Sequence, residues 1–234
     1  MQQLSTWLRG EEVQRLRRLV EVSGKIEPPK NPWELFRFKF NDMLGIVYSS
    51  GKVVYHEPLA SVIEDVLIEE EGIEVGSDEA GKGERTGPIV VAAVALDSEA
   101  RKHLRARGLL ESKSISRSKL MELASLVIER SEAYEVKVVF PKELFSRWRR
   151  GSLNELLVEW YYEVIAHVLG KVKASRVVID SFDERRLRER FSSLKDIEVV
   201  IEPKADEKYA SVAAASVLAK EIYLKNERKG TKWI

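Results

Sequence analysis

The chain has 234 residues, of which 44% are hydrophobic and 33% are charged, and its formal net charge is +1. These values are typical of a globular protein, and no apolar run reaches the roughly 20 residues that a membrane-spanning helix needs. The absence of cysteine excludes a disulfide framework, a thiolate nucleophile and a zinc–thiolate site. The N-terminus lacks the apolar core of a signal peptide, so we expect a cytoplasmic protein.

The first seventy residues have the pattern of a small α+β domain. Apolar residues at helical spacing predict an amphipathic helix over residues 4–22. Three segments rich in β-branched and aromatic residues predict strands, and Ser50-Gly51 is typical of a tight hairpin turn between the last two. Pro58 then begins a predicted helix, because a missing N–H costs nothing in a first helical turn. We therefore expect a separate α+β domain over residues 1–72.

From residue 73 onward, predicted strands alternate with predicted helices. Strands are expected over 73–79, 89–96, 134–140, 176–180 and 197–202. Helices are expected from Pro141, over 152–169 with a capping box at Ser152 and Glu155, after Asp183, and from Asp206 to about residue 226. Two hairpin-like strands followed by strands that helices separate predict a mixed sheet with helices on its faces. Residues 73–234 should therefore form an α/β domain.

Four carboxylates stand where predicted strands end or a predicted helix begins: Asp78, Glu79, Asp180 and Asp206. Burying an unpaired carboxylate costs several kcal/mol, so packing alone does not explain these positions. Mg²⁺ and Mn²⁺ prefer oxygen ligands of this kind. Consecutive strand residues face opposite ways, so Asp78 and Glu79 can share a site only if the neighbouring glycines let the backbone turn there. The sequence therefore predicts a divalent-metal site at the four acids.

Parts of this pattern are also compatible with roles that need no metal. Asp206 could be a helix cap, where the dipole favours an acid by about 0.3–1 kcal/mol, and Asp180 could be an ordinary loop acid. The spacing from Gly76 to Gly83 also approaches that of a phosphate-binding loop. However, Gly83 stands where such a loop has Ser or Thr, and two acids would lie inside the phosphate cradle. We therefore favour metal binding over nucleotide binding.

Several motifs together resemble the ribonuclease HII/HIII family. They are GSDEAGKG at 76–83 followed by GP, ESK at 111–113, NELL at 154–157, IDSF at 179–182 and KADEKYASVAAASVLAK at 204–220. Lysine at position 82 is similar to ribonuclease HIII, and the N-terminal part with its YSSGKVVYHE hairpin resembles the TATA-binding-protein-like domain of those enzymes. Glu111 stands where the family usually has Asp, and Glu84 stands where ribonuclease HIII often has Asp. Family members usually continue with further helical sequence beyond the equivalent of Ile234.

The resemblance implies a ribonuclease-H-like fold and an endonuclease that cuts the RNA strand of RNA/DNA hybrids, leaving 5′-phosphate and 3′-hydroxyl ends. It implies two Mg²⁺ or Mn²⁺ ions in the substrate complex, held by catalytic residues at the four acids, Asp78, Glu79, Asp180 and Asp206. Gly81, Lys82 and Gly83 would lie against the nucleic-acid backbone at the cleavage site, and Ser112 and Lys113 would contact the hybrid.

The physical chemistry of phosphodiester hydrolysis agrees with this resemblance. Two metals roughly 3.5–4 Å apart can activate water, neutralise the phosphate and stabilise the leaving oxygen. None of the three histidines, His56, His103 and His167, is near these motifs, so we expect no general-base histidine. The basic stretches 101–119 and 142–150 are candidates for phosphate contacts.

The expected partner is an RNA/DNA hybrid, and the chain is expected to be a monomer with no membrane and no obligate protein partner. We expect residues 1–72 to contribute modestly to substrate binding, because their strands carry Arg37, Lys39 and Lys52, and to contribute nothing to the chemistry, because they hold no catalytic motif. Two alternatives stay open. One is HII-like cleavage at single ribonucleotides in duplex DNA, and the other is a non-catalytic hybrid-binding module.

Overall fold

A computed structural model describes residues 2–84, 87–148 and 152–227, except for the side chains of residues 112–114. The chain divides into two compact units. The N-terminal unit consists of residues 1–70 and 101–113, and the C-terminal unit consists of residues 71–100 and 114–234. The sequence predicted two contiguous domains that meet at residue 72. The structure differs in one respect, because residues 101–113 return to the N-terminal unit.

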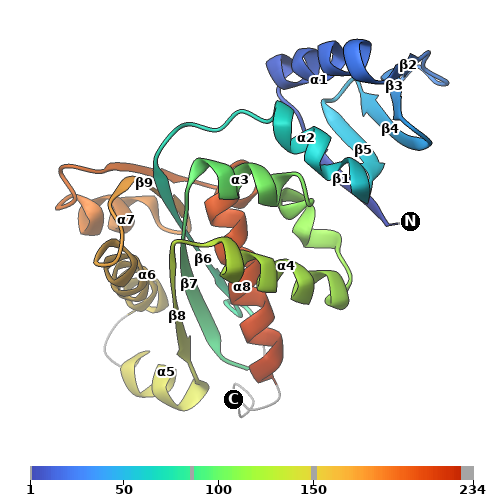
Figure 1. The fold of residues 1–234 in the computed structure, drawn as a ribbon. Coiled ribbons are helices and arrows are strands. Elements are labelled where there is room, and N and C mark those ends of the chain that lie inside the picture. The colour runs from blue at the N-terminus through green and yellow to red at the C-terminus, as the bar shows by residue number, and fades with distance from the viewer. Residues whose placement is uncertain (1, 85–86, 149–151, 228–234) are drawn as a thin grey trace. The chain divides into compact units, whose positions relative to one another are not determined.

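The N-terminal unit is an antiparallel five-stranded sheet with two helices on one face (Figure 1). Its elements in chain order are β1 (Gln3–Trp7), α1 (Gly10–Ser23), β2 (Lys25–Glu27), β3 (Glu34–Phe40), β4 (Met43–Tyr48), β5 (Lys52–His56), the 3₁₀ turn η1 (Glu57–Leu59) and α2 (Ala60–Val66). The strand order is β1-β5-β4-β3-β2. The expected hairpin at Ser50-Gly51 is confirmed, with Gly51 at φ +90°.

The predicted helix over residues 4–22 is wrong at its start. Residues 3–7 form a strand that pairs with β5, and the helix begins only at Gly10. Leu4 and Thr6 are buried while their neighbours are more exposed, which is the period of two that a strand requires. Strand β2 was not predicted at all. The helix pattern PLASVIEDVLIEE predicted a helix over residues 58–70, whereas α2 ends at Val66.

A buried ion pair holds the returning segment in the N-terminal unit. The Glu12 side chain is fully buried and accepts hydrogen bonds from both terminal nitrogens of Arg105, at 3.1 and 3.2 Å. The same carboxylate accepts from the backbone N–H groups of Arg9 and Ile68. The Tyr55 hydroxyl donates to the Ala106 carbonyl at 2.6 Å. These contacts hold the segment in the N-terminal unit, and Ala106 is part of that unit's hydrophobic core.

The C-terminal unit is a mixed five-stranded sheet between layers of helices, as the sequence predicted. The strands are β6 (Ile73–Ala80), β7 (Ile89–Leu96), β8 (Ala133–Val139), β9 (Ala174–Asp180) and β10 (Glu198–Glu202), in the order β10-β9-β6-β7-β8. Strand β6 runs antiparallel to β7 and parallel to β9, and β10 runs parallel to β9. Strand β7 is buried along its whole length.

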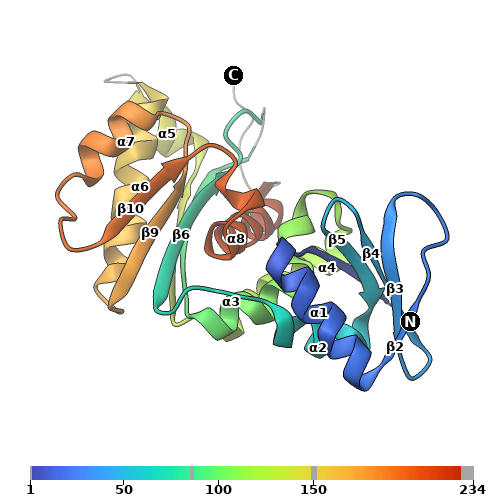
Figure 2. The ribbon, with the colours of Figure 1, turned by 90° about the horizontal axis from the view of Figure 1, so that it is seen from above.

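The helices cover both faces of this sheet (Figure 2). They are α3 (Ser98–Arg105, shared with the N-terminal unit), α4 (Arg117–Arg130), α5 (Pro141–Trp148), α6 (Leu153–Leu169), α7 (Glu184–Phe191) and α8 (Ala210–Asn226), with 3₁₀ turns η2 (Leu109–Ser114) and η3 (Ala205–Glu207). Helix α8 lies on one face, and α6 and α7 lie on the other. The capping box predicted at Ser152 and Glu155 is confirmed. No helix in the described ranges is long and apolar enough to cross a bilayer.

Gly76 allows α8 to approach β6 closely. A Cβ atom at this position would lie 2.1 Å from the Ser211 carbonyl carbon and 2.2 Å from the Val212 nitrogen, both backbone atoms of α8. We therefore expect Gly76→Ala to destabilise the protein by about 3 kcal/mol or more, measured as a lower Tm in thermal unfolding. Gly10→Ala is the control, because its Cβ would meet nothing within 4 Å. Equal Tm values for the two variants would contradict the close packing.

Candidate active site

The pairing of β6 with β9 brings two of the predicted acids together. Ser77 lies opposite Ile179 in this parallel pair, so the next residues, Asp78 and Asp180, end neighbouring strands at the same edge of the sheet. Ser216 of α8 hydrogen-bonds the Asp78 side chain, which places that carboxylate on the face that α8 covers. Two acids from positions a hundred residues apart therefore meet beside α8.

Asp78 is a strongly perturbed carboxylate. It is only 8% exposed, and its Oδ1 accepts a hydrogen bond from the Glu79 N–H at 2.8 Å. Burial, together with the neighbouring charges of Glu79 and Asp180, raises the pKa of Asp78 to about 8. Burial disfavours the charged form, and nearby negative charges do the same. A bound cation would remove this penalty, so the site has the electrostatics of a cation-binding centre.

Glu79 points to the opposite face of the sheet from Asp78. Strand β6 stays regular through Ala80, with Glu79 opposite Val91, and the first glycine after Glu79, Gly81, has a positive φ of +90°. The turn that was expected within the Asp-Glu pair therefore comes after it, and that expectation is wrong. The long glutamate side chain nevertheless remains at the sheet edge, where its charge is one of the causes of the raised Asp78 pKa.

Both oxygens of Glu79 have partners. The hydroxyl of Tyr161, on α6, donates to Oε2, and the Lys82 ammonium lies 3.4 Å from Oε1. Lys82 also lies over the Phe182 ring, 4.1 Å from its centroid. Burial and the neighbouring carboxylates raise the pKa of Tyr161 well above its ordinary value, so this hydroxyl stays protonated and acts as a donor. Sequence reasoning missed Tyr161, because nothing distinguishes it from the adjacent Trp160 and Tyr162.

Asp180 and Asp206 are connected through the backbone of η3. Oδ1 of Asp180 accepts a hydrogen bond from the Ala205 N–H at 2.9 Å, and Asp206 is the next residue. Asp206 was expected in the first turn of the long helix. That expectation is wrong, because α8 begins at Ala210 and Asp206 lies in the preceding 3₁₀ turn. The dipole of α8 is therefore not the reason for an acid here.

The described residues do not form a finished set of metal ligands. Over 2–84, 87–148 and 152–227, no three His, Asp or Glu side chains are placed so that they could hold one ion together. The structure brings Asp78, Glu79 and Asp180 within electrostatic reach, and Asp206 adjoins the amide that binds Asp180. The donor set of carboxylate oxygens suits a hard divalent cation. Binding would require these side chains to turn towards a common point.

The glycine turn borders a cavity next to the acids. Gly81 needs its lack of a side chain, because a Cβ would lie 2.2 Å from the Pro88 carbonyl oxygen, whereas Gly83 at φ +112° faces open space. The cavity has a volume of about 350 Å³. It is lined by Glu79, Ala80, Gly81, Glu84, Ser216, Lys220, Tyr223, Leu224 and Glu227. A ligand in this cavity would contact both the turn and one of the predicted catalytic acids.

The side chains of Ser112 and Lys113 lie outside the described part of the structure. Their backbone belongs to η2 in the N-terminal unit. Glu111 from the same motif pairs with Lys52 at 3.0 Å and accepts a hydrogen bond from the Trp7 indole. The ESK motif at 111–113, which falls within the predicted catalytic domain 73–234, therefore belongs to the N-terminal unit.

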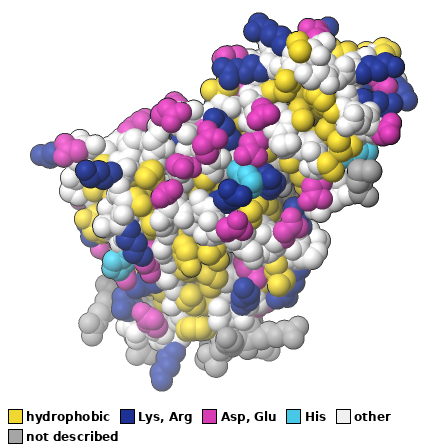
Figure 3. Space-filling model, viewed as in Figure 1, with side chains coloured by type: hydrophobic (Ala, Val, Ile, Leu, Met, Phe, Trp, Pro, Cys, Tyr) yellow, Lys and Arg dark blue, Asp and Glu magenta, His cyan; other side chains and the backbone are white. Residues whose placement is uncertain are grey.

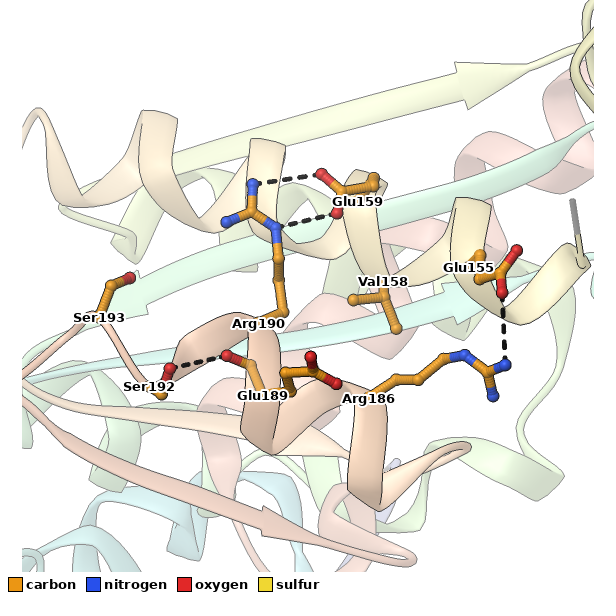
Figure 4. A pocket seen from close by; sticks show the side chains of 8 residues that line it. All are labelled: Glu155, Val158, Glu159, Arg186, Glu189, Arg190, Ser192 and Ser193. Carbon is orange, nitrogen blue, oxygen red and sulfur yellow. Dashed lines mark hydrogen bonds and ion pairs between the residues drawn. The ribbon is translucent and has the colours of Figure 1, made fainter.

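A second hollow lies between α6 and α7 and has a volume of about 530 Å³ (Figure 4). None of the predicted catalytic or nucleic-acid-binding residues is among the residues that line it. Its arginines already pair with acids, Arg186 with Glu155 and Arg190 with Glu159. On the face that Figure 3 shows, acidic and basic side chains are interspersed among the described residues. Neither feature marks a separate site for a charged ligand.

Comparison with known proteins gives one family. A family model described as Ribonuclease HII matches residues 75–230. Ribonuclease HII of Archaeoglobus fulgidus is 41% identical over 150 residues, which cover 63% of this chain and 70% of that protein. Ribonuclease HII of Thermococcus sibiricus is 38% identical over 151 residues, 62% of this chain, and the chain spans 65% of that relative, just under two thirds.

Two solved structures extend the comparison. RNase HII in the PCNA:RNase HII complex from Archaeoglobus fulgidus has a TM-score of 0.58 and 38% identity, covering 65% of this chain and 72% of that chain. Bst-RNase HIII in complex with Mn²⁺ has a TM-score of 0.62 and 22% identity, covering 97% of this chain and 82% of that chain. The second likeness concerns the fold alone. It extends over both units, whereas the ribonuclease HII matches cover about two thirds of the chain.

Proposed function

The chain belongs to the ribonuclease HII family, and from this premise we propose that it is a metal-dependent endonuclease that hydrolyses the RNA strand of RNA/DNA hybrids, leaving 5′-phosphate and 3′-hydroxyl ends. The observation that carries the proposal is the meeting of Asp78 and Asp180 at the ends of β6 and β9. A buried carboxylate with two partly buried carboxylates beside it, Asp180 and Glu79, is a donor set that suits a cation-assisted reaction on a phosphate.

We propose that Asp78, Glu79, Asp180 and Asp206 hold two Mg²⁺ or Mn²⁺ ions in the substrate complex. Such ions lower the pKa of a bound water and neutralise charge on the phosphate. The chain's own contribution is to fix the donors. The Ala205 amide orients Asp180, Ser216 orients Asp78, and Tyr161 orients Glu79.

We propose that Gly81, Lys82 and Gly83 contact the nucleic-acid backbone from the turn beside these acids. Ser112, Lys113 and the N-terminal unit would contribute to holding the hybrid. Three cations of that sheet are paired with acids, Arg37 with Glu34, Lys39 with Glu27 and Lys52 with Glu111. This pairing supports a modest electrostatic contribution to binding rather than a strong one. We further propose a cytoplasmic monomer without an obligate protein partner.

A second candidate is HII-like cleavage at single ribonucleotides in duplex DNA. The family model and the archaeal relatives, all described as ribonuclease HII, favour this activity. Lys82 and the presence of the N-terminal unit favour the HIII-like activity on continuous hybrids. The two activities differ in substrate only, so a substrate panel separates them.

The test offers the full chain a continuous RNA/DNA hybrid and a DNA duplex with one ribonucleotide, each with Mg²⁺ or Mn²⁺. Cleavage of the first substrate alone supports the HIII-like function, and cleavage of the second identifies the HII-like one. Asp180→Asn should be inactive, whereas Glu184→Gln, at an exposed position on α7, should keep wild-type activity. Hybrid binding without cleavage under all conditions would refute both activities in favour of a binding module.

A further inference from the structure

Glu79 is held on two sides by contacts of different kinds. Oε2 receives the Tyr161 hydroxyl from α6, and Oε1 faces the Lys82 ammonium at 3.4 Å. A neutral donor therefore binds one oxygen, and a positive charge lies beside the other. This asymmetry distinguishes the two oxygens of a side chain that is otherwise symmetrical.

The Tyr161 side of this arrangement is rigid. Tyr161 is completely buried, and its ring packs against Phe182, with the ring centroids 5.2 Å apart. Its helix α6 packs on the sheet through buried residues and begins with a capping box. A fixed hydroxyl that binds one carboxylate oxygen restricts the rotation of the carboxylate group.

The Lys82 side is adaptable. Lys82 follows Gly81 in the glycine turn, and its long side chain remains partly exposed. Oε1 therefore lies beside an existing positive charge, and Glu79 is one of the residues that line the cavity at the turn. A cation that binds Glu79 would contact Oε1, because Oε2 is already hydrogen-bonded to the buried Tyr161 hydroxyl.

We infer that Tyr161 is a positioning residue for Glu79, and that its hydroxyl holds Oε2 so that Oε1 alone is presented to a divalent cation. This inference rests on the proposed function. Hydrogen bonds from groups around metal ligands orient those ligands, and their loss typically costs 10–100-fold in metal affinity or activity. Tyr161 would act through Glu79 and would not touch the substrate.

The test is the affinity of the full chain for Mn²⁺, measured by titration calorimetry without nucleic acid. Tyr161→Phe keeps the ring and removes one oxygen atom, and we expect it to weaken Mn²⁺ binding by about tenfold or more. Tyr162→Phe is the matched control on the same helix. Its ring packs against Phe191 and under Arg190, away from the acids, so its Mn²⁺ affinity should equal that of the wild type.

A structural role alone would lower the Tm without changing the metal affinity, so thermal unfolding of both Phe variants is measured alongside. A second measurement repeats Tyr161→Phe in a Glu79→Gln background. If Tyr161 acts through Glu79, the second substitution adds no further loss of Mn²⁺ affinity, because coupled residues are not additive.

The inference would be overturned if Tyr161→Phe bound Mn²⁺ as tightly as the wild type does. It would also be overturned if Tyr161→Phe weakened Mn²⁺ binding as much in the Glu79→Gln background as in the wild type. Failure of the proposed function looks different. In that case the wild-type chain itself would neither bind Mn²⁺ nor cleave either substrate.

Discussion

Replacing Asp78 by asparagine is expected to abolish cleavage and, at the same time, to make the metal-free protein more stable. Cleavage should fall by roughly 10³-fold or more, since the loss of several kcal/mol of metal-assisted stabilisation corresponds to such a factor. The gain in stability of the metal-free protein comes from the removal of a buried charge. Asp78 is buried beside Glu79 and Asp180, and asparagine carries no charge there to be repelled or desolvated.

The stability difference should depend on pH in a defined direction. The pKa of Asp78 is raised from 3.8 to about 8 in the folded protein. A raised pKa contributes stability that is complete below the unfolded value and is lost as the pH rises through the folded value. The Tm of the wild type in EDTA should therefore fall from pH 5 to pH 9 relative to that of Asp78→Asn.

Asp196→Asn, at an exposed position, is the control for this comparison. The difference between its Tm and that of the wild type should be the same at pH 5 and at pH 9. A variant Asp78→Asn that still cleaves within tenfold of wild type would show that the acid is not part of the catalytic site.

The second large effect is expected at Glu12. This fully buried carboxylate receives two hydrogen bonds from Arg105 and two from backbone N–H groups. Glu12→Ala leaves Glu69 as the remaining acidic partner of Arg105 and leaves two backbone N–H groups without their acceptor, which should destabilise the N-terminal unit by about 3 kcal/mol. Limited proteolysis combined with mass spectrometry should show cleavage within residues 1–70 at temperatures where the wild type resists.

Glu11→Ala is the neighbouring control for that experiment. Glu11 is exposed and pairs with Arg15 one turn away, an arrangement worth about 0.3–0.5 kcal/mol. The two variants remove the same kind of side chain from adjacent positions. If they were equally stable, the buried pair would not be what holds residues 101–113 in this unit.

The fold of the C-terminal unit was largely predictable from the sequence. The runs that became β6, β7 and β9 are apolar and bounded by glycine or acidic residues, and their lengths suit strands. Helix α6 was predicted to begin after Ser152 because its capping box is a local signal. Such features depend on a few residues that are neighbours in the chain, so they can be recognised in the sequence without knowledge of the tertiary contacts.

The features that were missed depend on partners distant in the chain. Residues 3–7 continue the apolar spacing of α1, and only pairing with β5 makes them a strand. Residues 101–113 are basic and helical in pattern, and nothing in them indicates that Arg105 pairs with Glu12. Helix α8 begins at Ala210 and not at Asp206 as predicted, because the hydrogen bond from the Ala205 N–H to Asp180 stabilises a separate 3₁₀ turn before it.

The candidate site was predictable as a set of residue types but not as an arrangement. The sequence placed acids at the ends of strands, and the parallel register of β6 and β9 brings Asp78 and Asp180 together. The sequence did not predict that β6 stays regular past Glu79. Glu79 therefore points to the face that α6 covers, where Tyr161 donates a hydrogen bond to it. That contact depends on how α6 packs on the sheet.

The discontinuous make-up of the N-terminal unit has a consequence for synthesis on the ribosome. Nascent domains usually fold as units in the order in which they emerge. Here the first seventy residues cannot complete their core when they leave the exit tunnel, because Arg105 and Ala106 have not yet been translated. Strands β6 and β7 are made in the interval. The N-terminal unit can therefore complete its core only after the first two strands of the C-terminal sheet have been synthesised.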